Sequence, residues 1–188
     1  MPRQAHLRRL LEEFVPADER EARHRTRILQ LLERTDAPFS RDQYAPGHVT
    51  ASAFVTNTDQ SALLLILHSK LQLWLQPGGH VEPGDTDVLA SARREVLEEV
   101  GLSELELAKP GLFDVDVHDI PARRDQPAHA HFDVRFVFST RDLDAKAGSD
   151  ARDARWVPIS ELLDGTSHSA YQSDESVMRA VRKLQGVC

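Results

Sequence analysis

The chain of 188 residues has a single cysteine, Cys188, so no disulfide can form within it. Nothing in its cysteine usage indicates an oxidising compartment, and we expect a cytoplasmic location. Long apolar runs are also missing, and the charged N-terminus lacks the apolar core of a signal peptide. We therefore expect no membrane association.

The sequence has no excess of basic residues. Lysine and arginine number 23 and aspartate and glutamate 30, which gives a net charge of −7. Such a surface argues against broad binding to nucleic acid or to anionic lipid. Small phosphorylated substrates are compatible with it, because a bound cation can invert the local field. Aromatic residues make up only 6% of the chain, which gives little support for a dedicated base-stacking pocket.

Periodicity divides the chain near residue 45. Apolar residues at helical spacing predict helices over 4–14 and 18–34, in which we see no catalytic chemistry. Strands are predicted at 49–57, 62–69, 71–76, 112–119, 129–140 and 154–158, and further helices at 160–163 and 173–184. This order predicts an N-terminal helical extension at 1–45 and an α/β domain at 46–188, with a central mixed sheet between helices. We expect the extension either to pack on the α/β domain or to form part of an oligomer interface, such as that of a homodimer.

The most informative stretch is QPGGHVEPGDTDVLASARREVLEEVGL, residues 76–102. Its second half predicts a helix that ends at Gly101, and side-chain oxygens at its start come from Asp85, Thr86 and Asp87. Helical steps of about 100° place Glu95, Glu98 and Glu99 on one stripe. Neighbouring carboxylates repel unless a cation lies among them, and Mg²⁺ suits carboxylate oxygens. The simpler alternative is a solvated acidic helix face.

This stretch resembles the Nudix box, the signature of the Nudix hydrolase superfamily. The pattern is glycine, five residues, glutamate, seven residues, then Arg-Glu-aliphatic-any-Glu-Glu-any-Gly-aliphatic. Gly79 matches the first glycine, and residues 94–102, REVLEEVGL, match the second half at every position. Asp85 stands where the first glutamate belongs, and eight residues separate it from Arg94. We interpret the extra residue as an insertion in the loop before the helix.

The resemblance implies a Nudix-like α/β/α sandwich over about 46–188 and a MutT-like pyrophosphohydrolase activity. Such an enzyme cleaves a diphosphate linked to another moiety, such as a nucleotide derivative, by attack of a metal-activated water. It uses Mg²⁺, for which Mn²⁺ can substitute. The resemblance does not name the substrate.

The resemblance also implies roles for individual residues. The metal ligands are expected to be Glu95, Glu98, Glu99 and the backbone carbonyl of Gly79. Arg94 is expected to orient the glutamates through a charge-assisted hydrogen bond. The base that deprotonates the water is left open between Glu98, Glu95 and His131.

Polar residues alternate along two later strands, which places each set on one face of a sheet. The sets are Asp114, Asp116 and His118, and then His129, His131, Asp133 and Arg135. In one interpretation they form a pocket wall, where Arg135 binds a substrate phosphate and His129 and His131 donate hydrogen bonds or bind metal. In the other they keep an exposed edge strand soluble. His80 and Arg124, both on predicted loops, are further substrate-binding candidates with a solvated loop as the alternative.

Two other functions are compatible with this scaffold. A non-catalytic ligand-binding or regulatory module would have no need of the three glutamates that are present here. An isopentenyl-diphosphate isomerase would need a cysteine in its pocket, and the one cysteine is Cys188 at the last position. The hydrolase is therefore the preferred hypothesis.

Overall fold

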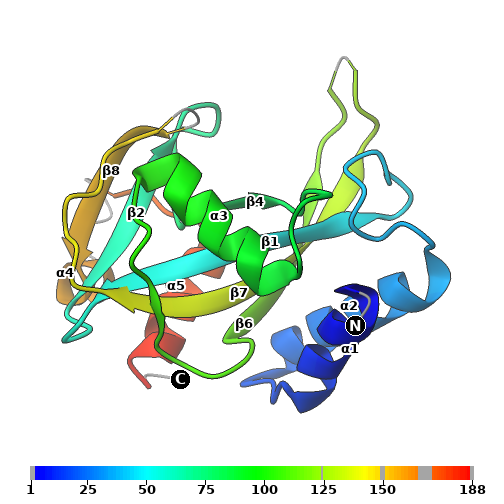
Figure 1. Ribbon diagram of the computed structural model, residues 1–188, viewed down its shortest axis with the longest axis horizontal. Helices are drawn as coiled ribbons and strands as arrows, with labels where there is room; N and C mark the ends of the chain where they lie inside the picture. Colours follow the sequence, from blue (N-terminus) through cyan, green and yellow to red (C-terminus); the bar gives the residue numbers. More distant parts are fainter. Residues whose placement is uncertain (1–2, 124, 149–150, 165–170, 187–188) are drawn as a thin grey trace. The chain divides into compact units, whose positions relative to one another are not determined.

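The computed structural model describes residues 3–123, 125–148, 151–164 and 171–186, so Arg124 and Cys188 lie outside the described residues. In chain order the elements are α1 (Arg3–Glu13), α2 (Glu19–Arg34), β1 (Gly47–Asn57), β2 (Ala62–His68), β3 (Trp74–Leu75), β4 (Gly78–His80), α3 (Val88–Val100), β5 (Glu106–Leu107), β6 (Asp114–Ile120), β7 (His129–Thr140), β8 (Ala151–Pro158), α4 (Ile159–Leu163) and α5 (Glu175–Leu184) (Figure 1). The predicted mixed α/β class is confirmed. No helix in the described part of the chain has the length and apolar character needed to cross a membrane.

The chain is divided into two compact units. The first unit comprises Met1–Ser52, Gly78–Ala92 and Pro110–Phe136, and the second comprises Ala53–Pro77, Arg93–Lys109 and Val137–Cys188. Three elements, β1, α3 and β7, therefore contribute residues to both units. Each unit is described separately below.

In the first unit, β4 pairs antiparallel with β1, so that Thr50 lies opposite His80. The opposite side of β1 neighbours β7, and β6 pairs antiparallel with β7 from Asp114–Arg135 to Ile120–His129. Helix α2 packs against β6, and α1 lies beside α2 (Figure 1). Because β7 is an internal strand and is almost wholly buried, the predicted exposed-edge alternative for this strand is wrong.

In the second unit the strand order is β3-β2-β1-β7-β5, and β8 pairs antiparallel with β2. Helix α4 packs against β8 and α5. The apolar face predicted for the last helix is buried in α5, at Val177, Val181 and Leu184. The capping residue of α5 is Asp174, whose carboxylate accepts a hydrogen bond from Val177 N at 3.0 Å.

The strand predicted at 71–76 is mostly a turn. Only Trp74–Leu75 is extended, while Gln72 has a positive φ of 57° and donates its N–H to the His68 carbonyl. The strand was predicted because Leu71, Leu73 and Leu75 occupy alternate positions. In the structure Leu71 and Leu73 lie in the tight turn that follows β2. The glycine-rich stretch after it was predicted as a loop, but its residues 78–80 form β4.

Gly47 is required at the start of β1. Its φ is +151°, and a Cβ at this position would overlap the backbone carbonyl of Ala130. A methyl group there must therefore push β1 away from β7. Gly84 offers a contrast, since nothing lies within 4 Å of the Cβ that a substitution would add.

We expect Gly47→Ala to lower the free energy of unfolding by about 1–3 kcal/mol, the usual cost of forcing extra atoms into a packed site. The matched substitution Gly84→Ala should be neutral within about 1 kcal/mol, because it meets open space. Urea denaturation of the two variants and the wild type measures the difference. Equal stability of the two variants would show that the Gly47 contact is not a constraint.

Candidate functional site

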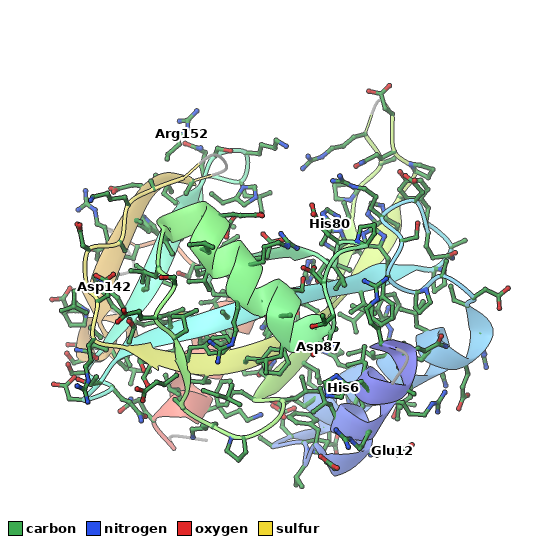
Figure 2. The ribbon with its side chains drawn as sticks, in the orientation of Figure 1. His6, Glu12, His80, Asp87, Asp142 and Arg152 are labelled. Carbon is green, nitrogen blue, oxygen red and sulfur yellow. The ribbon has the colours of Figure 1, made fainter. Side chains whose placement is uncertain are left out.

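Two aspartates in the loop before α3 make different hydrogen bonds and have different roles. Asp87 caps the helix, because its carboxylate accepts a hydrogen bond from Ala90 N at 2.9 Å, and Figure 2 shows it beside the first turn. Asp85 is 8% exposed and accepts a hydrogen bond from Glu82 N at 2.8 Å. The helix-start role predicted for Asp85 is therefore carried by Asp87, and Asp85 closes the preceding turn.

The exposed face of α3, in the second unit, places two carboxylates around one guanidinium. Arg94 Nη1 lies 2.9 Å from Glu95 Oε1 and 2.8 Å from Glu98 Oε2. The side chain of Glu98 is 52% exposed, whereas that of Glu95 is 12% exposed. Glu99 is buried, at 6% exposure. The guanidinium of Arg94 thus holds together two carboxylates that would otherwise repel each other. The carboxylate of Glu98 remains accessible to solvent.

The C-terminal end of α3 is held by the segment that follows β7. Gly148 N donates to the Glu99 carbonyl at 2.7 Å, and Lys146 N donates to the Val100 carbonyl at 3.0 Å. These bonds satisfy carbonyls that a helix end leaves without partners. Gly101 follows with a φ of +77°, the left-handed conformation expected after a helix. The glutamate-bearing turns are therefore fixed at their end by a loop as well as by the buried face.

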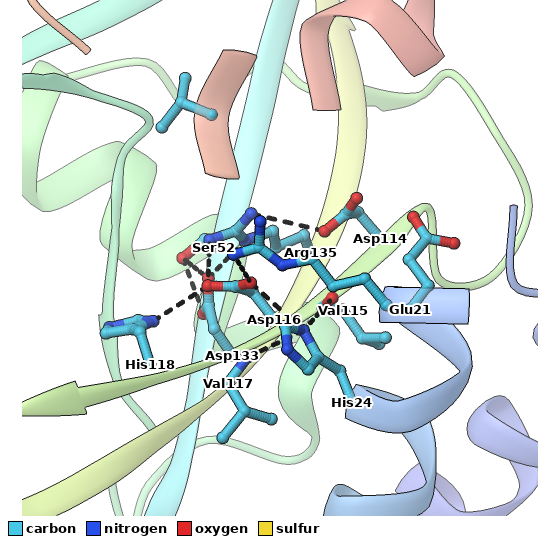
Figure 3. A network of polar contacts seen from close by, with 12 residues as sticks. Glu21, His24, Ser52, Asp114, Val115, Asp116, Val117, His118, Asp133 and Arg135 are labelled. Carbon is cyan, nitrogen blue, oxygen red and sulfur yellow. Dashed lines mark hydrogen bonds and ion pairs between the residues drawn. The ribbon is translucent and has the colours of Figure 1, made fainter. Parts of the chain in front are cut away.

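In the first unit, the strand register aligns the polar residues into one stripe. His118 lies opposite His131, Asp116 opposite Asp133, and Asp114 opposite Arg135. The third strand, β1, adds two hydroxyl groups. Thr50 donates to Asp133 at 2.9 Å, and Ser52 donates to Asp133 at 2.8 Å (Figure 3). We call these residues, together with His48 and His80 described below, the polar stripe.

Arg135 lies at the buried end of the stripe. It is 2% exposed, and its guanidinium lies 2.7 Å from Asp133 and 3.4 Å from both Asp114 and Asp116 (Figure 3). Burial alone would lower the pKa of Arg135, but the three carboxylates raise it above its usual value. The predicted contact with a substrate phosphate is inconsistent with this enclosure. Arg135 instead compensates three buried negative charges.

Asp116 connects the stripe to helix α2. Arg20 Nη2 and His24 Nδ1 of α2 lie 3.7 and 3.3 Å from its Oδ1, and His118 Nδ1 donates to its Oδ2 at 3.2 Å. Burial would raise the pKa of Asp116, but the contacts to His118 and His24 and the charge of Arg135 lower it well below its usual value. The carboxylate therefore stays ionised although it is only 1% exposed.

The other end of the stripe is a group of histidines. The predicted candidates His80, His129 and His131 come together there with His48, which was not predicted as a site residue. The ring centroid of His48 lies 5.0 Å from the centroids of His80 and His131 and 5.1 Å from that of His129. A signal for His48 existed in the sequence, because His48, Thr50 and Ser52 alternate along β1 as the polar residues do along β7.

Burial disfavours the protonated form of two of these histidines, His131 and His48. The pKa of His131 is lowered to about 2, and the largest cause is burial. The neighbouring histidines lower it further, namely His118, His48, His80 and His129. Burial also lowers the pKa of His48, against a raising contribution from the Gln43 carbonyl. One ligand atom each from His48, His80 and His131 lies within 4.8 Å of the other two, so these three side chains could hold a metal ion.

We expect Arg135→Met to cost about 3–5 kcal/mol of unfolding free energy, because it leaves three buried aspartates without their cation. The control is Arg8→Met, which breaks the surface pair to Glu33 whose side chains are 35% and 59% exposed and should change stability little. Chemical denaturation of both variants measures the effect. A loss at Arg135 no larger than that at Arg8 would contradict the assigned role.

Comparison with known proteins identifies what this arrangement is similar to. A family model described as the NUDIX domain matches residues 46–181. No curated protein matches the chain.

Several solved structures share the fold. A hydrolase of the NUDIX family from Clostridium perfringens is 23% identical, with a TM-score of 0.55, and the match covers 75% of this chain and 98% of that one. The MutT protein from Methanosarcina mazei is 15% identical, with a TM-score of 0.56 and coverage of 73% and 92%. The NUDIX domain of Shewanella oneidensis NrtR, crystallised with ADP ribose, is 17% identical, with a TM-score of 0.54 and coverage of 84% and 96%.

Proposed function

Because the chain belongs to the NUDIX family of hydrolases, we propose that it is a divalent-metal-dependent pyrophosphohydrolase that cleaves a phosphoanhydride in a small phosphorylated substrate. The observation that carries the proposal is the pair of carboxylates, Glu95 and Glu98, gathered by Arg94 on the exposed face of α3. The position of Glu98 makes it accessible to a ligand from solvent, since its side chain is 52% exposed.

The chemistry of the donor set fits Mg²⁺, with Mn²⁺ as a substitute. Carboxylate and carbonyl oxygens are the ligands that these ions prefer. We propose Glu98 and Glu99 as ligands, with Glu95 as the third carboxylate, as the family pattern implies. A bound divalent cation would neutralise charge on the phosphate oxygens and make a water acidic enough to attack.

The protein's own residues then have distinct tasks. Arg94 positions the two carboxylates through charge-assisted hydrogen bonds of 2.9 and 2.8 Å. The base that accepts the proton of the attacking water is Glu98 or Glu95. His131, the third candidate, is disfavoured, because a base with a pKa of about 2 has little affinity for a proton at neutral pH.

The proposed substrate class is supported by the reaction type and by the ligand of one similar structure. The NrtR domain binds ADP ribose, in which a diphosphate joins two moieties. We therefore propose a diphosphate linked to another group as the substrate. Nucleoside triphosphates, nucleotide sugars and dinucleotides belong in the same test panel as ADP ribose.

We expect Glu98→Gln to lower turnover at least about 100-fold with an unchanged fold, because the residue lies on the exposed face of α3 and not in the core. The control is Glu104→Gln, an exposed glutamate beyond the end of the helix, which should keep full activity. The measurement is metal-dependent cleavage across the panel, by coupled phosphate release with Mg²⁺, with Mn²⁺ and with chelator.

Near-normal turnover of Glu98→Gln on a cleaved substrate would refute the assignment of the glutamates. Absence of cleavage across the panel, with substrate-class compounds still binding in calorimetry, would favour the non-catalytic binding module.

A further inference from the structure

We propose that His48, His80 and His131 form a metal site for a nitrogen-preferring divalent cation of the Zn²⁺ class. Strands β1, β4 and β7 of the first unit each contribute one of these residues. The ligand atoms lie within 4.8 Å of one another. Bonds of about 2.0–2.1 Å to a tetrahedral zinc ion put nitrogens about 3.4 Å apart, so small ring rotations suffice to close the site.

His48 is oriented as a metal ligand. Its Nδ1 lies 3.1 Å from the Gln43 carbonyl. A carbonyl only accepts, so Nδ1 carries the proton and Nε2 has the free lone pair. Among the described residues, Nε2 is a buried atom with no hydrogen-bond partner, on a side chain that is 1% exposed. An unpaired buried acceptor is costly unless something fills its place, and a cation held by neighbouring imidazoles would do so.

The surrounding histidines are oriented in the same way. Nδ1 of His129 donates to the Pro127 carbonyl at 2.8 Å, and Nδ1 of His118 donates to the Asp116 carboxylate at 3.2 Å. The rings of both residues lie close to His131, with centroid distances of 5.3 and 5.5 Å. Histidines that bind metal generally donate their second ring nitrogen to a carbonyl or carboxylate in this manner.

The chemistry of the donors indicates the class of cation, because all three offer an imidazole nitrogen. Imidazole nitrogens select Zn²⁺ and similar ions, whereas Mg²⁺ prefers oxygen. Three protein ligands leave a fourth position for water or for an oxygen of a bound molecule. His129, at the margin of the group, lines an open cavity of about 570 Å³.

The simpler interpretation is a hydrated cluster of imidazoles held only by ring packing. That interpretation predicts no selective affinity for Zn²⁺. The two can be separated by direct measurement of metal binding, which does not depend on whether the protein hydrolyses any substrate.

The experiment is calorimetric titration of the full chain with Zn²⁺ in the presence of excess Mg²⁺. We expect one Zn²⁺ to bind the wild type, and His131→Gln and His48→Gln each to weaken binding at least about 100-fold, since loss of an outer partner alone costs about 10–100-fold. Two controls should keep the wild-type affinity: His6→Gln, which changes a histidine on α1 outside the group, and Glu98→Gln, which changes the carboxylate face of α3.

A second measurement covers the case in which a histidine variant does not fold, which circular dichroism will reveal. Wild-type protein loaded with Co²⁺ should show the intense visible absorption of a low-coordinate, nitrogen-ligated ion, and Zn²⁺ should abolish it by displacement. The proposal is overturned if the wild type binds no Zn²⁺ under excess Mg²⁺, or if binding survives in folded His131→Gln but is lost in Glu98→Gln.

Discussion

The first unit depends on one buried guanidinium. Arg135 is enclosed by Asp114, Asp116 and Asp133, and any arrangement that separates it from them leaves charge buried without compensation. A slip of one residue between β6 and β7 would turn every side chain to the opposite face of the sheet. The ion cluster therefore fixes the register, and the same register places His118 opposite His131. The geometry of the histidines is thus a consequence of electrostatics further along the same strands.

The sequence predicts best where a periodic pattern and a local signal agree. The α3 helix has an apolar stripe, a capping aspartate and a terminal glycine, and its predicted extent matches the structure. Alternation along β6 and β7 correctly predicted which residues share a face. It could not predict that Arg135 is buried, because alternation does not show which elements pack over a face. Period-two patterns identify a face but not what covers it.

The chain carries two sets of side chains that differ in the kind of cation they suit. Carboxylates on α3 are stabilised by Arg94, whereas the imidazoles of the polar stripe are oriented by the Gln43 and Pro127 carbonyls. Oxygen and nitrogen donors differ in the ions they prefer, so the two sets need not compete for one metal. The site residues themselves remain predictions, but the donors of each set are supported by neighbours that fix their charge or their tautomer. Arg94 belongs to the motif and its role was predicted, whereas the Gln43 and Pro127 carbonyls carry no sequence signature and no motif revealed them.

The contacts of Arg20 and His24 with Asp116 bear on where this protein can be divided. The family model matches residues 46–181, so a fragment cut at residue 46 would omit α1 and α2. Side chains of α2 nevertheless reach Asp116, a buried carboxylate on β6 of the same unit. A recombinant fragment cut at the family boundary would therefore lack part of the interior of the first unit.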